Sequence, residues 1–413
     1  MASFYALANS YPHETAPTVF NELKVMSGNR PVELIQGIKH DGSFELLITR
    51  DEEEYFWRRK KIRVRRWNDE DFQSLSPIQF ASAEDLKKKM IKLGKDAKKH
   101  KDSQSLDGVY KGQYECGRLY RMIALDNIKD YARFGITQAV RSQLLAARIK
   151  SFTYTRWSRR NPNNPRAIEV LDMGISEADT NSLSPVLNAT VRFKNTQNSG
   201  LKQAGFREAD TFGTQHPFDR DTITERLNDF FSISSGEAPS VIILVHNEEG
   251  TRQVLKDFNV DTRHIVSGTK KLFYPERTRY QGREGTARPR IYLLDLQKIY
   301  QILYRTPNDS ASVKEIANRT RVTSPCSPEE WNAGNDAKYM IDIWKRFTYG
   351  LSINEEYEAI NREEQHTLQQ AALPAPLQTV DDDDDDDIDP NSIQAVVPGP
   401  TYDYDDAPSD DEE

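Results

Sequence analysis

The chain has 413 residues, of which 37% are hydrophobic and 29% are charged, with a formal net charge of −8. This balance is too lean for a wholly globular chain, so we expect folded domains diluted by polar segments. Cys116 and Cys326 lie far apart and outside any CxxC spacing, which indicates neither a disulfide framework nor a zinc site. The sequence shows no secretion signal and no apolar run of membrane-spanning length. We therefore expect an intracellular protein, cytoplasmic or nuclear, without a membrane partner.

The acidic residues concentrate near the C-terminus. From Asp381 onward there are 15 of the 64 acidic residues and no Lys or Arg, which leaves 49 acidic and 56 basic residues in the remainder. We expect residues 374–413 to form a disordered acidic tail. The mildly basic remainder is compatible with nucleic acid as a partner. The tail either solubilises the chain or competes for the same surface by imitating phosphate.

Residues 1–105 are predicted to form a small, basic, β-rich module. Short apolar runs alternate with polar ones from Val19 to Trp67, and the string "KHDGS" favours a turn between two of them. The Lys-dense stretch "AEDLKKKMIKLGKDAKKHKDSQS" is typical of a solvated helix that runs into a linker near residues 103–108.

The centre of the chain changes from helical to mixed character. Residues 106–148 show helical periodicity and are interpreted as a connector, and residues 149–350 have α/β character. The predicted strands there are "KSFTYTRW", "AIEVLDMGIS", "NATVRFKN", "PSVIILVHN" and the start of "RIYLLDLQKIYQIL", with "GTRQVLKDFNV" as a helix. Several strands thus come first, followed by alternating helices and strands. Residues 351–373 are predicted to be a polar helix.

The helix predicted in "EEWNAGNDAKYMIDIWKRF" carries an aspartate on its apolar side. The positions that define the buried face are Ala337, Met340, Ile341, Trp344 and Phe347. Asp336 lies one turn before Met340 on this face, and an inward carboxylate needs a partner. Either the side chains of Asn332, Asn335 and Asp336 cap the helix start, or Asp336 is a metal ligand. We expect the two asparagine amides or nearby backbone N–H groups to hold Asp336.

Four segments together resemble the ribonuclease H-like 3′-to-5′ exonucleases of the DEDDh type. They are the strand ending in "LVHN", its following helix, the strand "LLDLQ" and the helix opening with "WNAGNDAKYM". The string from Trp331 to Ala337 matches six of seven positions of the motif His-Asn-Ala-Gly-Asn-Asp-Ala, which marks the fungal exonuclease-like branch of this family. The resemblance covers residues 149–350 and implies a ribonuclease H-like mixed sheet flanked by helices.

The same resemblance implies four acidic side chains that hold two divalent ions and a histidine as general base. This chain departs from that pattern at most positions. The first motif falls on Thr153 and Thr155, the second on Thr251, and the general base on Trp331, so only Asp336 is retained. Hydroxyl groups do not replace carboxylates around a hard cation. The resemblance therefore implies a degenerate site without a resident cofactor, in a groove formed by His246, Asn247, Asn332, Asn335 and Asp336.

The stretch "YFWRRKKIRVRRW" offers a second surface. Seven basic residues interleave with aromatic and apolar ones: Arg58, Arg59, Lys60, Lys61, Arg63, Arg65 and Arg66. Cations that meet phosphates beside rings that stack on unpaired bases suit nucleic acid. The alternative is a strand whose aromatic side faces the core and whose Arg side pairs with residues 51–54.

These observations favour a non-catalytic nucleic-acid-binding protein built on a degenerate exonuclease domain. RNA is the nucleic acid that we expect it to bind. One alternative is an active exonuclease in which Mg²⁺ or Mn²⁺ is held by Asp336 with displaced acids, the candidates being Glu169, Asp172, Glu248 and Glu249. The other is a protein-interaction scaffold without nucleic acid. The oligomeric state and a protein partner stay open.

Overall fold

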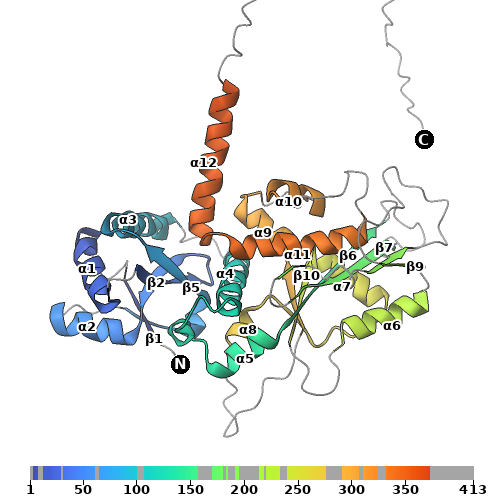
Figure 1. Ribbon diagram of the computed structural model, residues 1–413, viewed down its shortest axis with the longest axis horizontal. Coiled ribbons are helices and arrows are strands. Elements are labelled where there is room, and N and C mark those ends of the chain that lie inside the picture. The colour runs from blue at the N-terminus through green and yellow to red at the C-terminus, as the bar shows by residue number, and fades with distance from the viewer. Residues whose placement is uncertain are drawn as a thin grey trace, which may run out of the picture. The chain divides into compact units, whose positions relative to one another are not determined.

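The computed structural model is shown in Figure 1. It describes residues 3–7, 13–28, 31–60, 65–99, 107–156, 170–179, 183–184, 191–194, 214–217, 220–232, 240–275, 291–306, 310–322 and 332–372. Contacts divide the chain into a first unit, Met1–Glu363, and a second unit, Glu364–Glu413. Within the described ranges the first unit is an α/β structure with two sheets, which confirms the predicted α/β character.

The N-terminal sheet is antiparallel, with the order β4-β1-β3-β2-β5. Its strands are β1 (Ser3–Ala6), β2 (Val32–Lys39), β3 (Phe44–Ile48), β4 (Arg66–Asn68) and β5 (Phe72–Phe80). The predicted turn joins β2 to β3 and places Gly42 at φ 78°, a backbone conformation that favours glycine. Helices α1 (Ala16–Met26) and α3 (Ala83–Lys99) bury one face of this sheet, with Leu23 and Leu86 in the shared core.

The segment from Tyr55 to Trp67 is not one continuous strand, which corrects the second interpretation of this stretch. Residues up to Lys60 belong to helix α2 (Arg50–Lys60), and only Arg66 and Trp67 enter β4. The helix begins after Thr49, whose hydroxyl and N–H both bond the carboxylate of Glu52. This reciprocal cap, written T-x-x-E in the sequence, overrides the β-type composition that follows.

The second sheet is mixed, with the order β11-β12-β10-β6-β7-β8-β9. Its strands are β6 (Arg148–Arg156), β7 (Val170–Glu177), β8 (Val191–Lys194), β9 (Thr214–Pro217), β10 (Val241–Val245), β11 (Ile265–Ser267) and β12 (Ile291–Asp295). The β6–β7 and β7–β8 pairs are antiparallel, and the other pairs are parallel. The five predicted strands are confirmed, and the short β9 and β11 are additional.

Helices cover both faces of this second sheet. On one face, α6 (Arg220–Phe230) and α7 (Glu248–Asp257) share a core with Phe152 and Ile243. On the other face lie α4 (Asp107–Ala124), α9 (Leu296–Leu303) and α11 (Ala333–Tyr349), and Figure 1 shows α11 running across β6 and β10. The apolar positions predicted for α11, from Ala337 to Phe347, are all buried. The other helices are α5 (Gln138–Ala146), α8 (Lys270–Phe273), α10 (Val313–Arg319) and α12 (Ile353–Ala372).

Helix α4 belongs to the core as well as connecting the two sheets. Its residue Glu115 is fully buried and accepts hydrogen bonds from Gln36 of β2 and from the N–H of Ile353 at the start of α12, and it also pairs with Arg118. One carboxylate thus ties three segments together, which makes the first unit cohesive. None of the helices in the described ranges is long and apolar enough to cross a membrane.

Candidate functional site

The N-terminus of α11 lies directly on the second sheet. A Cβ atom added at Gly174 of β7 would lie 1.9 Å from the carbonyl oxygen of Ala333 and 2.7 Å from the backbone nitrogen of Gly334. Only a glycine allows this approach of helix backbone to strand backbone. Because Gly174 pairs with Thr153 of β6, the helix start is fixed beside the first predicted motif.

The first turn of α11 is capped by two side chains. The Asn332 Oδ1 accepts a hydrogen bond from the N–H of Asn335 at 3.0 Å, so the predicted asparagine cap is confirmed. The Asp172 Oδ2 accepts one from the N–H of Ala333 at 3.2 Å. A carboxylate at a helix N-terminus also interacts favourably with the helix dipole. Asp172, which the sequence offered only as a displaced acid, is therefore part of the helix cap.

Asp336 lies beside Asp172. The Oδ1 of Asp336 is buried and has no hydrogen-bond partner among the described residues, so neither an asparagine amide nor a backbone N–H holds this oxygen as expected. Burial and, second, the carboxylate of Asp172 raise the pKa of Asp336 to about 8. Two acids that share a site cannot both be charged at low energetic cost. At neutral pH Asp336 is mostly a neutral acid.

The threonines of the first motif face the same helix. Ser151 of β6 donates its hydroxyl hydrogen to the carbonyl of Ala337 at 2.6 Å, which fixes the face of this strand that looks toward α11. Since strand side chains alternate, Thr153 and Thr155 lie on that face too. The register pairs Thr155 with Asp172. The structure thus places Thr153 and Thr155 on the sheet face that carries Asp172, under the first turns of α11.

The residues after β10 have structural roles. His246 Nε2 is 2.7 Å from the carbonyl oxygen of Ala311, and burial lowers the pKa of this histidine, so it is a neutral hydrogen-bonded side chain. Asn247 caps α7 by accepting from the N–H of Gly250 at 2.7 Å, and Thr251 is buried. In the described part of the chain, no hydrogen bond or ion pair connects these three to Asp172 or Asp336.

A polar network closes the nearby edge of the parallel strands. Asp295, at the end of β12, accepts from the N–H groups of Glu248 at 2.8 Å and Lys298 at 3.0 Å, and so caps both α7 and α9. Burial raises the pKa of Asp295 to about 6. Glu248 itself pairs with Arg252 and accepts from the Ser267 hydroxyl. Sequence reasoning missed Asp295, although an aspartate directly after a strand and before a helix is a recognisable cap.

The four acids that were considered as displaced metal ligands therefore lie in different surroundings. Asp172 reaches Asp336, whereas Glu248 is engaged with Arg252 and Glu249 is exposed on α7. Glu169 and the degenerate position Trp331 lie outside the described residues. The sequence did not single out Asp172 because the pairing of β6 with β7, which brings it to the site, depends on the strand register.

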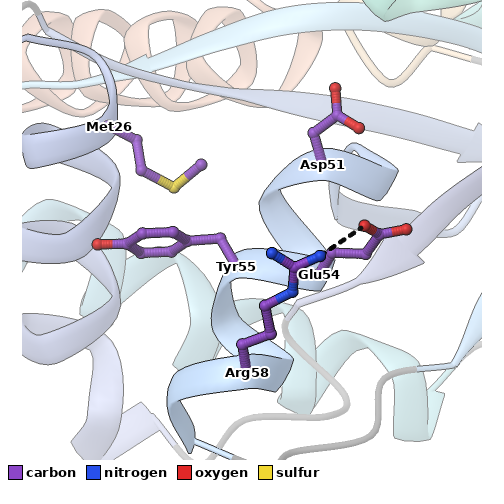
Figure 2. Close-up of a pocket in the computed structure, with 5 residues that line it drawn as sticks. All are labelled: Met26, Asp51, Glu54, Tyr55 and Arg58. Carbon is purple, nitrogen blue, oxygen red and sulfur yellow. Dashed lines mark ion pairs between the residues drawn. The ribbon is translucent and has the colours of Figure 1, made fainter.

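The basic stretch is partly engaged in its own module. Arg58 pairs with Glu54 at 3.8 Å, and both side chains line a cavity of about 350 Å³. Figure 2 shows these two residues on α2, facing Met26 of α1. The hydroxyl of Tyr55 donates to Glu22. The predicted pairing with the acidic residues 51–54 is thus present at Arg58, although this side chain is 80% exposed and its ion pair is weak.

The other basic residues of the stretch fall into two groups: those whose side chains are exposed, and those that lie outside the described residues. Arg65 lies over the ring of Trp67 at 3.9 Å and Lys39 over the same ring at 4.7 Å, so this ring is already occupied by cations. Arg65 and Arg66 are exposed. The side chains of Arg59 and Lys60, and all of Lys61 and Arg63, lie outside what the structure describes. The exposed cations can contact phosphate, but Trp67 is poorly placed to stack on a base.

The donor set does not fit a two-metal site. Three positions that the resemblance assigns to carboxylates are Thr153, Thr155 and Thr251, and hydroxyls are poor substitutes around Mg²⁺ or Mn²⁺. In the described ranges, no group of three or more His, Cys, Asp or Glu side chains gathers in a metal-binding arrangement. The sequence matches no protein-family model and has no significant match among curated proteins.

Proposed function

We propose that the chain is a non-catalytic nucleic-acid-binding protein, with single-stranded RNA as the first ligand class, built on a degenerate ribonuclease H-like domain. The order of elements supports this assignment, since three antiparallel strands precede alternating strands and helices in a mixed sheet covered on both faces. The motif from Asn332 to Ala337 opens the last helix of the sheet domain, against the first two strands.

The observation that carries the proposal is the composition of the site under α11. Its polar side chains are Thr153, Thr155, Asp172 and Asp336, and Asp336 is held near neutrality by burial and by Asp172. Such a set lacks the charge that two divalent ions require. Binding without hydrolysis is the function that this chemistry supports best.

Salt-dependent affinity tests the binding function. We expect the purified full chain to bind a single-stranded uridine oligonucleotide with a dissociation constant that rises steeply as salt rises from 50 to 300 mM, because Arg and Lys displace counterions from phosphates. Replacing exposed Arg66 by Gln should reduce the slope of log affinity against log salt by about one. Fluorescence anisotropy measures both. An absence of salt-sensitive binding would favour a protein-interaction scaffold instead.

The proximity of Asp172 to Asp336 favours one second candidate, an exonuclease with displaced acidic ligands. Calorimetric titration with Mn²⁺ distinguishes this exonuclease from the non-catalytic binding protein. We expect no binding that depends on Asp336, because a protonated acid and its neighbour are a weak pair of ligands. The comparison uses Asp336→Ala, Asp172→Asn and, as the matched control on the same helix, Asp342→Ala, whose side chain pairs with Lys338 at 2.7 Å. If the wild type binds Mn²⁺, and the heat of binding is lost in Asp336→Ala and Asp172→Asn but kept in Asp342→Ala, the exonuclease becomes the better-supported function.

A further inference from the structure

A cavity of about 660 Å³ lies where the N-terminal sheet and its helices meet the segment between α4 and α5. Its walls come from the end of α1, the start of β2, the first turn of α2, Gln79 of β5 and residues 127–133. Pockets that bind small molecules have volumes of roughly 300–1,000 Å³ and are common where two modules meet. Neither Asp172 nor Asp336 lines this cavity, so it is separate from the site under α11.

Arg133 is a fixed part of the cavity wall. Its Nη2 donates to the backbone oxygen of Glu33 at 2.6 Å and to the carboxylate of Glu52 at 2.8 Å. Glu52 is itself held by Thr49 at the start of α2. Two nitrogens of Arg133 form no hydrogen bond among the described residues: Nε, which is buried, and Nη1. Because its Nη2 is anchored, the guanidinium can present Nη1 to an oxygen of a ligand without losing its own contacts.

The charged groups of the wall are of both signs. They are the carboxylates of Glu33, Glu52 and Asp130 and the cations of Lys129 and Arg133. Glu52 and Arg133 neutralise each other, and Asp130 accepts a hydrogen bond from the backbone N–H of Arg133. In the described part of the chain Lys129 has no hydrogen bond or ion pair, and Glu33 accepts only a long bond, 3.4 Å, from Gln79. One cation and two carboxylates of the wall therefore lack an ion pair, and a purely anionic ligand would meet excess negative charge.

The rest of the wall is apolar or carries amide groups. Leu23 and Met26 of α1 and Ile128 supply apolar surface, and the side-chain amides of Gln79 and Asn127 can both donate and accept hydrogen bonds. Helix α1 ends at Met26, and the carbonyl end of a helix favours a positive group. The wall thus offers partners for an ammonium group, a carboxylate, an amide and an apolar body at once.

We propose that this cavity binds a small zwitterion with an apolar body, of the class of a short apolar peptide with free ends. Lys129 and the Nη1 of Arg133 bind its carboxylate, and Glu33 and Asp130 bind its ammonium group. The peptide unit bonds the amides of the wall, and the apolar side chains lie on α1. The site is additional to nucleic-acid binding, since none of the exposed arginines assigned to RNA lines the cavity.

Three ligands test the zwitterion on the full wild-type chain. They are the dipeptide leucyl-leucine, its N-acetyl form, which lacks the ammonium group, and its C-terminal amide, which lacks the carboxylate. We expect leucyl-leucine to bind saturably with a dissociation constant below about 1 mM. Each blocked form should bind at least about tenfold more weakly, because it leaves a charged group of the wall without a partner. Titration calorimetry measures all three.

Two variants assign the two ends of the ligand. Lys129→Ala should weaken binding of leucyl-leucine about tenfold and leave binding of the amide unchanged, because the amide has no carboxylate to lose. Glu33→Gln should weaken leucyl-leucine to a similar degree and leave the N-acetyl form unchanged. Lys24→Ala is the matched control, since Lys24 is exposed in the last turn of α1 but does not line the cavity, and it should bind as the wild type does.

The opposite results are equally clear. If leucyl-leucine does not bind, or if both blocked forms bind as tightly as it does, the cavity is no zwitterion site. Tight binding of the N-acetyl form alone would indicate an anion site and would also overturn the proposal. A loss in Lys24→Ala equal to that in Lys129→Ala would mean that surface charge in general, and not the cavity, determines binding.

Discussion

Gly174→Ala is expected to destabilise the chain by at least about 3 kcal/mol, the largest effect that we predict for a single methyl group. The new Cβ would lie 1.9 Å from the Ala333 oxygen and 2.3 Å from its carbonyl carbon, and both are backbone atoms that cannot rotate away. Helix α11 would have to lift from β7. That shift breaks the bond from the Ala333 N–H to Asp172 and exposes part of the apolar face of α11. The midpoint of urea unfolding measures the change.

Gly117→Ala is the matched control for this prediction. Gly117 also faces α11, but its added Cβ would meet side-chain atoms, the Thr348 methyl at 3.1 Å and the Trp344 indole nitrogen at 3.4 Å. Because side chains can shift and alanine favours a helix, we expect a change within about 1 kcal/mol. A Gly174→Ala protein as stable as the wild type would mean that α11 does not lie on β7 as described, and the candidate site would lose its geometry.

The strands and helices of the second sheet could be predicted because buried elements have recognisable patterns of apolar residues in the sequence. The runs around Ile243 and Leu293 are apolar throughout, as strands covered on both faces must be, and α11 shows its buried face at three-and-four spacing. Helix α2 was missed because its C-terminal half has aromatic and basic residues typical of a strand. The reciprocal cap between Thr49 and Glu52 was the readable signal.

The candidate site was predicted only in part, for a different physical reason. Periodicity placed Asp336 on a helix and the two threonines on a strand, but Asp172 comes from the neighbouring strand, and the register that aligns it with Thr155 is a tertiary property. The hydrogen bond from the Ile353 N–H to Glu115 likewise joins two helices far apart in sequence. Periodicity identifies which face of a helix is buried, but it does not identify the partner.

The stability of the wild type is expected to fall as pH rises from about 5 to 8, and Asp336→Asn should remove most of that fall. The pKa of Asp336 is raised from 3.8 to about 8 in the folded state, so between these values the folded chain binds more protons than the unfolded chain. Stability then decreases with rising pH across that window. The asparagine has nearly the same shape and no charge. At pH 8 we expect Asp336→Asn to exceed the wild type by about 2 kcal/mol, a discounted value because the side chain is only partly buried.

The difference between the two proteins isolates Asp336 from other titrating groups. Asp295, with a pKa of about 6, contributes a decrease of the same sign below pH 6, but it is present in both proteins and cancels in the comparison. Asp342→Asn is the control, since it breaks the ion pair with Lys338 and should give no gain at pH 8. The midpoints of urea unfolding of the wild type and of both variants, at pH 5 and at pH 8, measure this difference in stability. Equal pH dependence in wild type and Asp336→Asn would mean that Asp336 is charged in the folded protein, which would return it to the role of a possible metal ligand.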